Sequence, residues 1–242
     1  MGFKLDNFTE SLKSGIKYLP VTAKLTLVAV VIGLIIGLFI AIFRYYKIPV
    51  ISHILTVFIT IYQGLPMMVA LLIYNLLFSY YIGPFIDFFH LNIDVNKVNN
   101  IIVAYFALSL AAITTMSETF RGALNSVEKT QFEAGYSVGL TKFQTFKRII
   151  LPQVIPVAIP GLINNLVGVI KGTSFVMAIG VLEVTNASLI PCFKTFSYVE
   201  GYLAAAIIYW FFTIILEVIL STIEKKYSKK SIKSEVSYAW LK

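Results

Sequence analysis

Lys171 is the residue of this sequence whose position most strongly indicates chemistry. It lies inside an apolar run, 155–181, that is long enough to cross a bilayer, and a charged side chain at membrane depth is costly and usually functional. Gly172, Thr173 and Ser174 follow it directly, and this combination can unwind a helix locally and expose backbone donors to a cavity. The pattern is typical of substrate binding or gating, in which the ammonium group meets a substrate carboxylate.

Several polar groups elsewhere in the chain are candidates to share this site. They are the carboxylates Glu118 and Glu183 and the amides Gln63, Asn164 and Asn165. A structural ion pair with one of the carboxylates, or snorkelling of the ammonium group to the membrane surface, is an equally good explanation of Lys171. The amides suit a path for a zwitterionic solute, because each can donate and accept hydrogen bonds. Hydrogen bonding between helices is the alternative role that we favour for them.

Patterns typical of enzymes do not hold up in this sequence. Residues 135–139 fit G-x-S-x-G, but that nucleophile elbow needs a histidine downstream, and His53 and His90 both precede it. The P-loop pattern G-x-x-x-x-G-K-[ST] is absent, so we expect ATP to bind elsewhere and no cofactor to bind this chain. Cys192 is the single cysteine and offers neither a disulfide framework nor a metal cluster.

The composition indicates that lipid is the solvent for most of the chain. Of its 242 residues, 58% are hydrophobic and 13% are charged, and the mean hydropathy is +0.83. An ordinary soluble domain has about 25% charged residues. The net charge of +8 does not indicate nucleic-acid binding, because the basic residues flank apolar runs and do not alternate with aromatic residues on a polar surface.

The apolar runs predict an all-α, polytopic membrane protein with about five transmembrane helices. The runs are 25–43, about 50–79, 98–117, a stretch within 155–181, and about 199–223. We expect a kink at Pro66 in the second run and a loop at Gly83 and Pro84 after it. Gly33 and Gly37 form a G-x-x-x-G pattern that can pack one helix against another. We expect no cleaved signal peptide, and residues 1–20 to form an amphipathic helix lying on the membrane surface.

The distribution of lysine and arginine predicts the orientation, because these residues collect on the cytoplasmic side. One side would hold Arg44, Lys47, Arg121, Lys129, Lys142, Lys147, Arg148, Lys225, Lys226, Lys229, Lys230, Lys233 and Lys242. The other side would hold Lys4, Lys13, Lys17, Lys24, Lys97 and Lys194. The first and larger set marks the cytoplasmic side. This predicts an external N-terminus, a transmembrane domain over 21–224, and a cytoplasmic basic tail over 225–242.

The long polar insert between the third and fourth runs carries a spaced motif. Glu133, Ala134 and Gly135 are followed, after three residues, by Gly139. Nine further residues separate Gly139 from the run 149–152, which reads I-I-L-P and ends at Pro152. We expect a short helix that breaks at Gly139 and a return toward the membrane at Pro152. The motif resembles the EAA loop of permeases that belong to importers of the ATP-binding-cassette (ABC) superfamily. Gly135 departs from it, since the family usually has alanine there.

The surrounding residues resemble the polar amino-acid permeases of that superfamily. The run 117–127 is similar to their A-E-x-x-R-G-A-x-x-S-V, 149–153 to I-I-L-P-Q, and 170–174 to I-K-D-T-S. The resemblance extends over residues 20–225. At 62–66 the chain has Y-Q-G-L-P where the family typically has F-R-G-T-P, which weakens any role inherited at that arginine. Lys171 and Gly172, together with 179–183, are closer to permeases assigned to cystine.

This resemblance implies a type I ABC importer permease fold in a bacterial inner membrane. It makes residues 118–153 the coupling loop that docks on a dimer of ATPase subunits, which would bind ATP and Mg²⁺. The docking residues would be Glu133, Ala134, Gly135, Gly139, Leu140, Ile149, Leu151 and Pro152. Other implied partners are an extracytoplasmic amino-acid-binding protein and a second permease copy or sister permease, within membrane lipid and without nucleic acid. An ion-coupled secondary transporter, or a scaffold that recruits a partner to the membrane, are the alternatives.

Overall fold

The computed structural model describes residues 3–90, 92–94 and 98–239, and every regular element in this part of the chain is helical. The helices are α1 (Leu5–Tyr45), α2 (Ile51–Gln63), α3 (Met67–Phe88), α4 (Ile101–Asn125), α5 (Lys129–Ser137), α6 (Lys142–Thr145), α7 (Leu151–Gly172), α8 (Val184–Leu189), α9 (Cys192–Thr195) and α10 (Tyr198–Ala239). A π-helical turn (Phe146–Ile150) precedes α7, and a 3-10 helix (Thr173–Ile179) follows it. Lys97 and Lys242, which enter the predicted orientation, lie outside the described residues.

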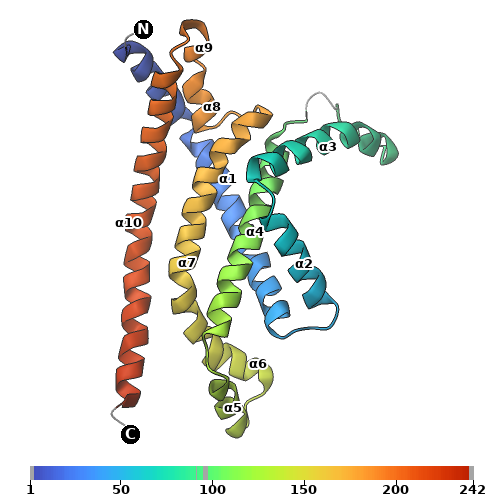
Figure 1. Ribbon diagram of the computed structural model, residues 1–242, viewed down its shortest axis with the longest axis vertical. Coiled ribbons are helices and arrows are strands. Elements are labelled where there is room, and N and C mark those ends of the chain that lie inside the picture. The colour runs from blue at the N-terminus through green and yellow to red at the C-terminus, as the bar shows by residue number, and fades with distance from the viewer. Residues whose placement is uncertain (1–2, 91, 95–97, 240–242) are drawn as a thin grey trace.

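Five helical segments among the described residues are long and apolar enough to cross a membrane, as the sequence predicted. They are Leu5–Tyr45, Met67–Phe88, Ile101–Asn125, Lys142–Ile179 and Tyr198–Thr222. Figure 1 shows α1, α4, α7 and α10 running along the length of the molecule. Large apolar side chains on their outer surfaces remain exposed, such as Trp210 at 61% and Val218 at 62%, as expected where lipid is the solvent.

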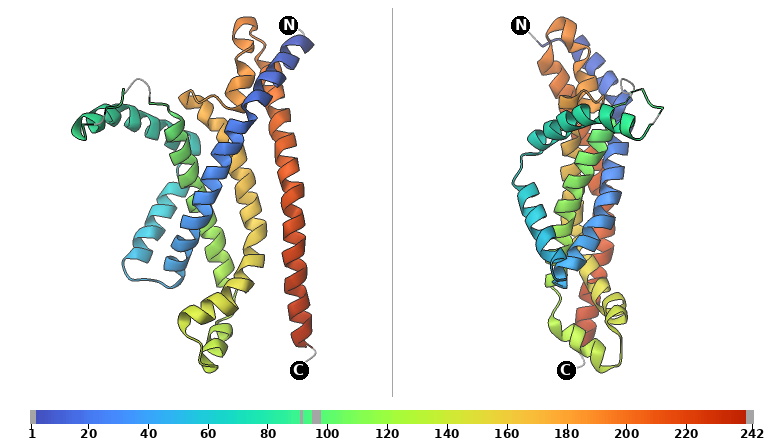
Figure 2. Two further views of the ribbon diagram at one scale, coloured as in Figure 1. Left: turned by 180° about the vertical axis from the view of Figure 1, so that it is seen from behind. Right: turned by 90° about the vertical axis from the view of Figure 1, so that its right-hand side faces the viewer.

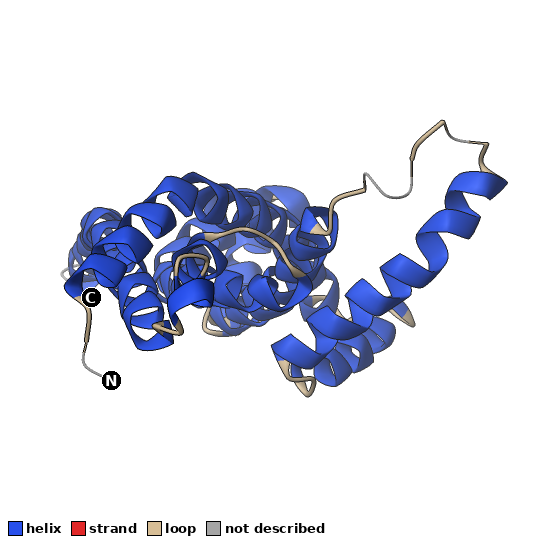
Figure 3. Ribbon diagram, turned by 90° about the horizontal axis from the view of Figure 1, so that it is seen from above, coloured by secondary structure: helices blue, strands red, loops and turns tan. Residues whose placement is uncertain are grey.

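The second predicted span is two helices in the structure. α2 ends at Gln63, the chain turns through Gly64 and Leu65, and α3 begins after Pro66. The proline fixes this break, because it has no N–H to continue the hydrogen bonding of α2. The predicted loop at Gly83 and Pro84 is wrong, since both residues lie inside α3 near its C-terminal end. Figure 3 shows the bundle from above, with α3 extending away from it.

The predicted boundary at residue 20 does not separate two elements. α1 runs unbroken through Pro20, so residues 5–20 continue the first span and form no separate surface helix. Small residues explain the continuity: Ser11 and Gly15 are buried, and a Cβ atom on Gly15 would lie 2.2 Å from Ser188 Oγ of α8. The N-terminal half of α1 therefore packs against α8 and is not free to lie flat.

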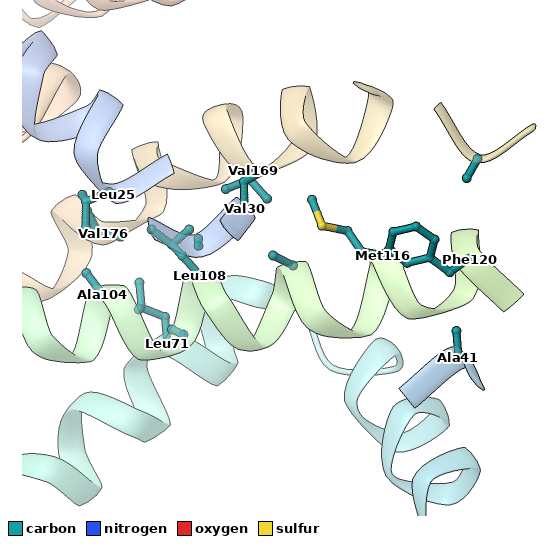
Figure 4. Packing of buried hydrophobic residues seen from close by; sticks show 14 of the residues in the cluster. Leu25, Val30, Ala41, Leu71, Ala104, Leu108, Met116, Phe120, Val169 and Val176 are labelled. Atoms are coloured by element: carbon teal, nitrogen blue, oxygen red, sulfur yellow. The ribbon is translucent and has the colours of Figure 1, made fainter. Parts of the chain in front are cut away.

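The core is built where α1 packs closely on α4. A Cβ atom on Gly33 would lie 2.7 Å from the Cβ of Ala112, and one on Gly37 would lie 3.1 Å from the backbone nitrogen of Ser117. The G-x-x-x-G pattern is thus a helix-packing face, as predicted. Figure 4 shows the adjoining core, to which α1 contributes Leu25 and Val30 and α4 contributes Leu108 and Met116.

The two ends of the molecule are different in character. Figures 1 and 2 place α5 and α6 at the end where α10 finishes, and place α8 and α9 at the opposite end, beside the N-terminus. The polar insert and the C-terminal helix therefore end on the same side of the bundle. This arrangement agrees with an odd number of spans between the N-terminus and the tail.

A methyl group at Gly33 is expected to destabilise the fold by about 1–3 kcal/mol, because it overpacks the contact between α1 and α4. Gly122→Ala is the matched control, since a Cβ atom at Gly122 meets nothing within 4 Å. That variant is expected to gain roughly 0.5–1 kcal/mol from helix propensity. Thermal unfolding of the purified protein in detergent should show opposite shifts for Gly33→Ala and Gly122→Ala. Equal midpoints would contradict the packing.

Candidate functional site

The polar insert folds into a helix, a tight turn and a return into α7. α5 ends at Ser137, and Gly139 adopts the left-handed backbone conformation with φ +81°, so the break predicted at this glycine is confirmed. α6 then begins with a capping box, in which Gln144 N donates to Thr141 Oγ1 and Thr141 N donates to Gln144 Oε1. Pro152 lies in the first turn of α7, a position where proline is tolerated.

The inner side of the insert is packed on itself and on α1. Gly135 is buried against Thr145, and a Cβ atom there would lie 2.5 Å from Thr145 Cγ2. Phe132 of α5 stacks on Tyr45 at the end of α1, with 6.1 Å between ring centroids. Phe146, in the π-helical turn, lies 6.3 Å from the ring of the neighbouring Tyr46. The insert is therefore fixed to the C-terminal end of α1 by aromatic contacts.

The outer side of the insert exposes apolar side chains. Val138 is 75% exposed and Phe143 is 70% exposed, in a segment that is otherwise polar. Among the residues predicted to dock, Glu133, Ala134, Gly139 and Pro152 are exposed, Leu140, Ile149 and Leu151 are partly buried, and Gly135 is buried. Val138 and Phe143 are therefore candidates for contact with a partner protein.

The sequence allowed an ion pair between Glu118 and Lys171. In the structure, Glu118 is held instead by two arginines at the insert end of α4. Its Oε1 accepts from Arg44 of α1, and its Oε2 accepts from Nε and Nη2 of Arg121 at 2.9 and 2.7 Å. The Arg44 side chain is 7% exposed, and its Nε also donates to Thr56 Oγ1 of α2 at 3.1 Å. This partly buried ion pair joins α1, α2 and α4. The role of Arg44 was not predicted, because a basic residue at the end of an apolar run is also what a topology signal looks like.

Glu183 is also occupied by other groups. The carboxylate is fully buried and caps α8, accepting from the backbone N–H groups of Thr185 and Asn186 at 2.9 Å each. It also accepts from the Tyr209 hydroxyl at 2.7 Å, and that hydroxyl lies 2.9 Å from Thr173 Oγ1. Burial raises the pKa of the Glu183 carboxyl, while the hydrogen bonds from Thr185, Tyr209 and Asn186 act in the opposite direction.

Lys171 is exposed in the last turn of α7 and has no ion pair among the described residues, so the predicted pairing with Glu118 or Glu183 is wrong. The α-helix ends one residue later, and the 3-10 helix begins at Thr173, which agrees with the expected local change in the backbone. Thr173 is buried. The Ser174 hydroxyl donates to the backbone oxygen of Lys171 at 2.7 Å.

The predicted amides divide between two surroundings. Asn165 Nδ2 donates to Thr119 Oγ1 of α4 at 2.8 Å, so this side chain joins two helices. Asn164 is exposed, and it lies seven residues before Lys171, which places both on one face of α7. Gln63 is exposed at the end of α2. The structure thus leaves Lys171, Asn164 and Gln63 free to meet a ligand or partner, and commits Asn165 to packing.

Comparison with known proteins identifies what this arrangement resembles. Residues 33–229 match the family of binding-protein-dependent transport system inner membrane components. The probable amino-acid permease protein YxeN of Bacillus subtilis is 36% identical over 214 residues, covering 88% of this chain and 91% of the relative. The L-cystine transport system permease protein TcyL of the same organism is 31% identical over 212 residues, covering 88% and 86%. Both are similar along nearly their whole length.

A solved structure has the same arrangement of helices. It is a crystal structure of an amino acid ABC transporter with histidines, 28% identical in sequence. The similarity covers 93% of this chain and 100% of that chain, with a TM-score of 0.75. The predicted fold, that of type I ABC importer permeases, is confirmed by this similarity.

The contact between Gly135 and Thr145 predicts a compensating pair of substitutions. Gly135→Ala is expected to lower the thermal midpoint of the purified protein and to speed hydrogen exchange in α5, at a cost of about 1–3 kcal/mol from overpacking. Adding Thr145→Ala removes the methyl and hydroxyl groups that the new Cβ would meet, at 2.5 and 2.7 Å. The double variant should therefore recover most of the loss. Strictly additive effects in this double-mutant cycle would rule out the contact.

Proposed function

The chain belongs to the family of binding-protein-dependent transport system inner membrane components and is a permease subunit of an amino-acid importer. On that premise, we propose that it couples ATP hydrolysis by a separate subunit to the movement of a polar amino acid. The observation that carries the proposal is the polar insert. Its motif has the spacing of a coupling loop, and its folded form exposes Val138 and Phe143 at the end of the bundle where the spans finish.

The insert is proposed to receive the force of the ATPase. Its exposed residues Glu133, Ala134, Val138 and Phe143 offer a mixed polar and apolar surface to a groove on the ATPase dimer. The inner side is joined to α1 through Phe132 and Tyr45 and to α7 through the π-helical turn. Movement of α5 would therefore act on two spans at once. ATP and Mg²⁺ would stay on the partner, and this chain would be a non-catalytic translocation subunit.

The far end of α7 is proposed to meet the substrate. Lys171 has an exposed ammonium group that no described carboxylate neutralises, and it lies where the helix changes to 3-10 geometry. An amino-acid carboxylate would satisfy this charge by a charge-assisted hydrogen bond. The Glu183–Tyr209–Thr173 hydrogen bonds hold the first residue of the 3-10 helix in place. Asn164, on the same face of α7, would supply a further polar contact.

Cystine is the substrate that we favour within this class. The sequence around Lys171 and Gly172 has the form seen in permeases assigned to cystine, and TcyL, which carries that name, is similar over 88% of this chain. The proposed assembly contains an ATPase dimer, an extracytoplasmic amino-acid-binding protein and a second permease copy or sister permease. We propose that the N-terminus is outside and that the insert and tail are cytoplasmic, in a bacterial inner membrane.

Reconstitution tests the function directly. The chain is co-purified with the proteins encoded beside its gene, placed in proteoliposomes, and supplied with the binding protein and a panel of labelled amino acids that includes cystine. Uptake of one solute that requires ATP is the expected result. Uptake driven by an ion gradient without ATP would instead identify a secondary transporter. Co-purification of no ATPase would overturn the proposal.

Removing the charge of Lys171 should raise the KM for uptake about tenfold to a hundredfold, because a hydrogen bond to a charged group contributes roughly 1.5–3 kcal/mol. Lys171→Gln is the test variant, and Lys171→Arg, which keeps the charge, is the matched control. Thermal unfolding of each variant checks that the fold is intact. Unchanged uptake kinetics for Lys171→Gln would remove this residue from the substrate site.

A further inference from the structure

A chain of side-chain oxygens joins the 3-10 helix, α10 and the start of α8. Thr173 and Glu183 are fully buried, and the Tyr209 hydroxyl lies between them, 2.9 Å from Thr173 Oγ1 and 2.7 Å from Glu183 Oε2. At the other end of the chain, Thr173 Oγ1 lies 2.6 Å from the backbone oxygen of Ile170. All three distances are those of hydrogen bonds between oxygens, so each contact needs one hydrogen.

An ionised Glu183 leaves this chain one hydrogen short. A carboxylate has none to donate, and the hydroxyls of Thr173 and Tyr209 have one each, so two hydrogens would serve three contacts. If Tyr209 donates to Glu183, the single hydrogen of Thr173 has to serve the contacts at both 2.6 and 2.9 Å. If Tyr209 donates to Thr173 instead, no hydrogen lies on the 2.7 Å contact with Glu183.

A proton on Glu183 supplies the missing hydrogen. The carboxyl group then donates to Tyr209, Tyr209 donates to Thr173, and Thr173 donates to the backbone of α7, so that each of the three contacts is a hydrogen bond. The backbone N–H groups of Thr185 and Asn186 each donate to a carboxyl oxygen at 2.9 Å. These two bonds are compatible with the protonated form, because a carboxyl group keeps acceptor capacity when it carries a proton.

The surroundings of Glu183 favour the neutral form. A buried carboxylate is normally paired with a cation, but no charged side chain among the described residues contacts Glu183, and Tyr209 is the one titratable group that does. On the side of α1, the neighbouring segment meets uncharged groups, since Leu12 and Leu19 pack with Tyr209 around Val184. Burial is the largest influence on the Glu183 carboxyl and raises its pKa.

The far end of the chain fixes the backbone that carries Lys171. Ile170 and Lys171 lie in the last turn of α7, and Thr173 is the first residue of the 3-10 helix. The Thr173 hydroxyl is bonded to the backbone before Lys171, while Thr173 itself lies after it. The hydrogen bonds from Glu183 and Tyr209 therefore hold the turn of chain from which Lys171 extends.

From this geometry we infer that Glu183 carries a proton and is a positioning residue for the substrate site. Through Tyr209 and Thr173 it holds the backbone at Lys171 in the form that receives a substrate carboxylate. Loss of the proton removes one hydrogen bond from the chain and weakens substrate binding, which makes this site sensitive to pH. The positioning role rests on the proposed function, whereas the proton on Glu183 does not.

Infrared spectroscopy of the complete importer tests the proton directly. At neutral pH, the difference spectrum between the wild type and Glu183→Gln should contain the C=O band of a protonated carboxyl group. The band should shift in Tyr209→Phe, which removes the acceptor of its hydrogen bond. It should stay in place in Tyr202→Phe, the matched control, because Tyr202 is an exposed tyrosine of α10. Carboxylate bands of Glu183 at neutral pH, in place of the protonated band, would overturn the inference.

The pH dependence of uptake tests the positioning role. Because the pKa of Glu183 is raised in the folded protein, its proton is present at low pH and is lost as the pH rises from 4.5, the ordinary pKa, through the folded-state pKa. The KM of the wild type is compared on the two sides of the pH at which the infrared band disappears. It should rise about twofold to tenfold with little change in kcat, the effect of one hydrogen bond.

Two variants separate this role from a purely structural one. Glu183→Gln has no titrating group at this position, so its KM should not follow the rise seen in the wild type. Other groups of the importer and the substrate itself titrate alike in both proteins and cancel in the comparison. Tyr209→Phe breaks the chain at every pH and should raise KM by a similar factor, whereas Tyr202→Phe should not.

The contrary results are equally specific. A KM that rises with pH in Glu183→Gln as much as in the wild type would assign the titration to another group. A Tyr209→Phe variant with the KM of the wild type and a lower thermal midpoint would limit the chain to a role in stability.

Failure of the proposed function gives a different pattern. In that case the wild-type importer takes up no amino acid at any pH, while the infrared band of Glu183 and its shift in Tyr209→Phe can still be measured. Failure of this inference alone leaves wild-type uptake intact and the protonated band missing.

Discussion

Close packing of α1 on α4 is the interaction on which the rest of this structure depends. Lipid tails are as apolar as the helices, so hydrophobic burial does little to hold spans together, and tight van der Waals contact has to do so. Gly33 and Gly37 allow that contact by letting α1 approach the backbone of α4. α1 then extends beyond the contact in both directions. Its C-terminal end holds the polar insert through Tyr45, and its N-terminal half packs against α8 at Gly15.

Charged groups in the structure fall into two sets with different roles. Glu118 and Glu183 are satisfied within the protein, by Arg44 and Arg121 in one case and by backbone N–H groups and Tyr209 in the other. A buried carboxylate without such partners would be strongly destabilising. Lys171 and the exposed residues Lys13, Lys17 and Lys194 have no such partner among the described residues. Lys171 lies within a span, whereas the other three lie on the N-terminal half of α1 and on α9. The unsatisfied set is the one available to bind ligands and partners.

Much of the site could be predicted from the sequence because it depends on local spacing. The break at Gly139 and the start of α7 near Pro152 follow from backbone preferences of single residues. The kink expected at Pro66 is a full break between α2 and α3, and the loop expected at Gly83 and Pro84 lies inside α3, because an apolar run does not reveal how far each helix extends. The pairing of Arg44 with Glu118 and the contact of Gly15 with Ser188 were not predictable, since each joins residues far apart in the sequence. Arg44 is 74 positions from Glu118, and local patterns contain no information about such contacts.

The fourth span has the least regular backbone of the structure, and this bears on how the two ends communicate. A π-helical turn at Phe146–Ile150 precedes α7, Pro156 and Pro160 interrupt its hydrogen bonding, and a 3-10 helix follows it at Thr173. Each of these features weakens the continuous i→i−4 hydrogen bonding that makes a helix stiff, and short π and 3-10 segments are often found at functional sites. In the proposed mechanism, a force on α5 would enter this span through the π-helical turn. Because α7 can change shape at defined points along its length, movement of the insert would bend α7 at those points, while the aromatic contact of Phe132 with Tyr45 would transmit the same movement to the end of α1.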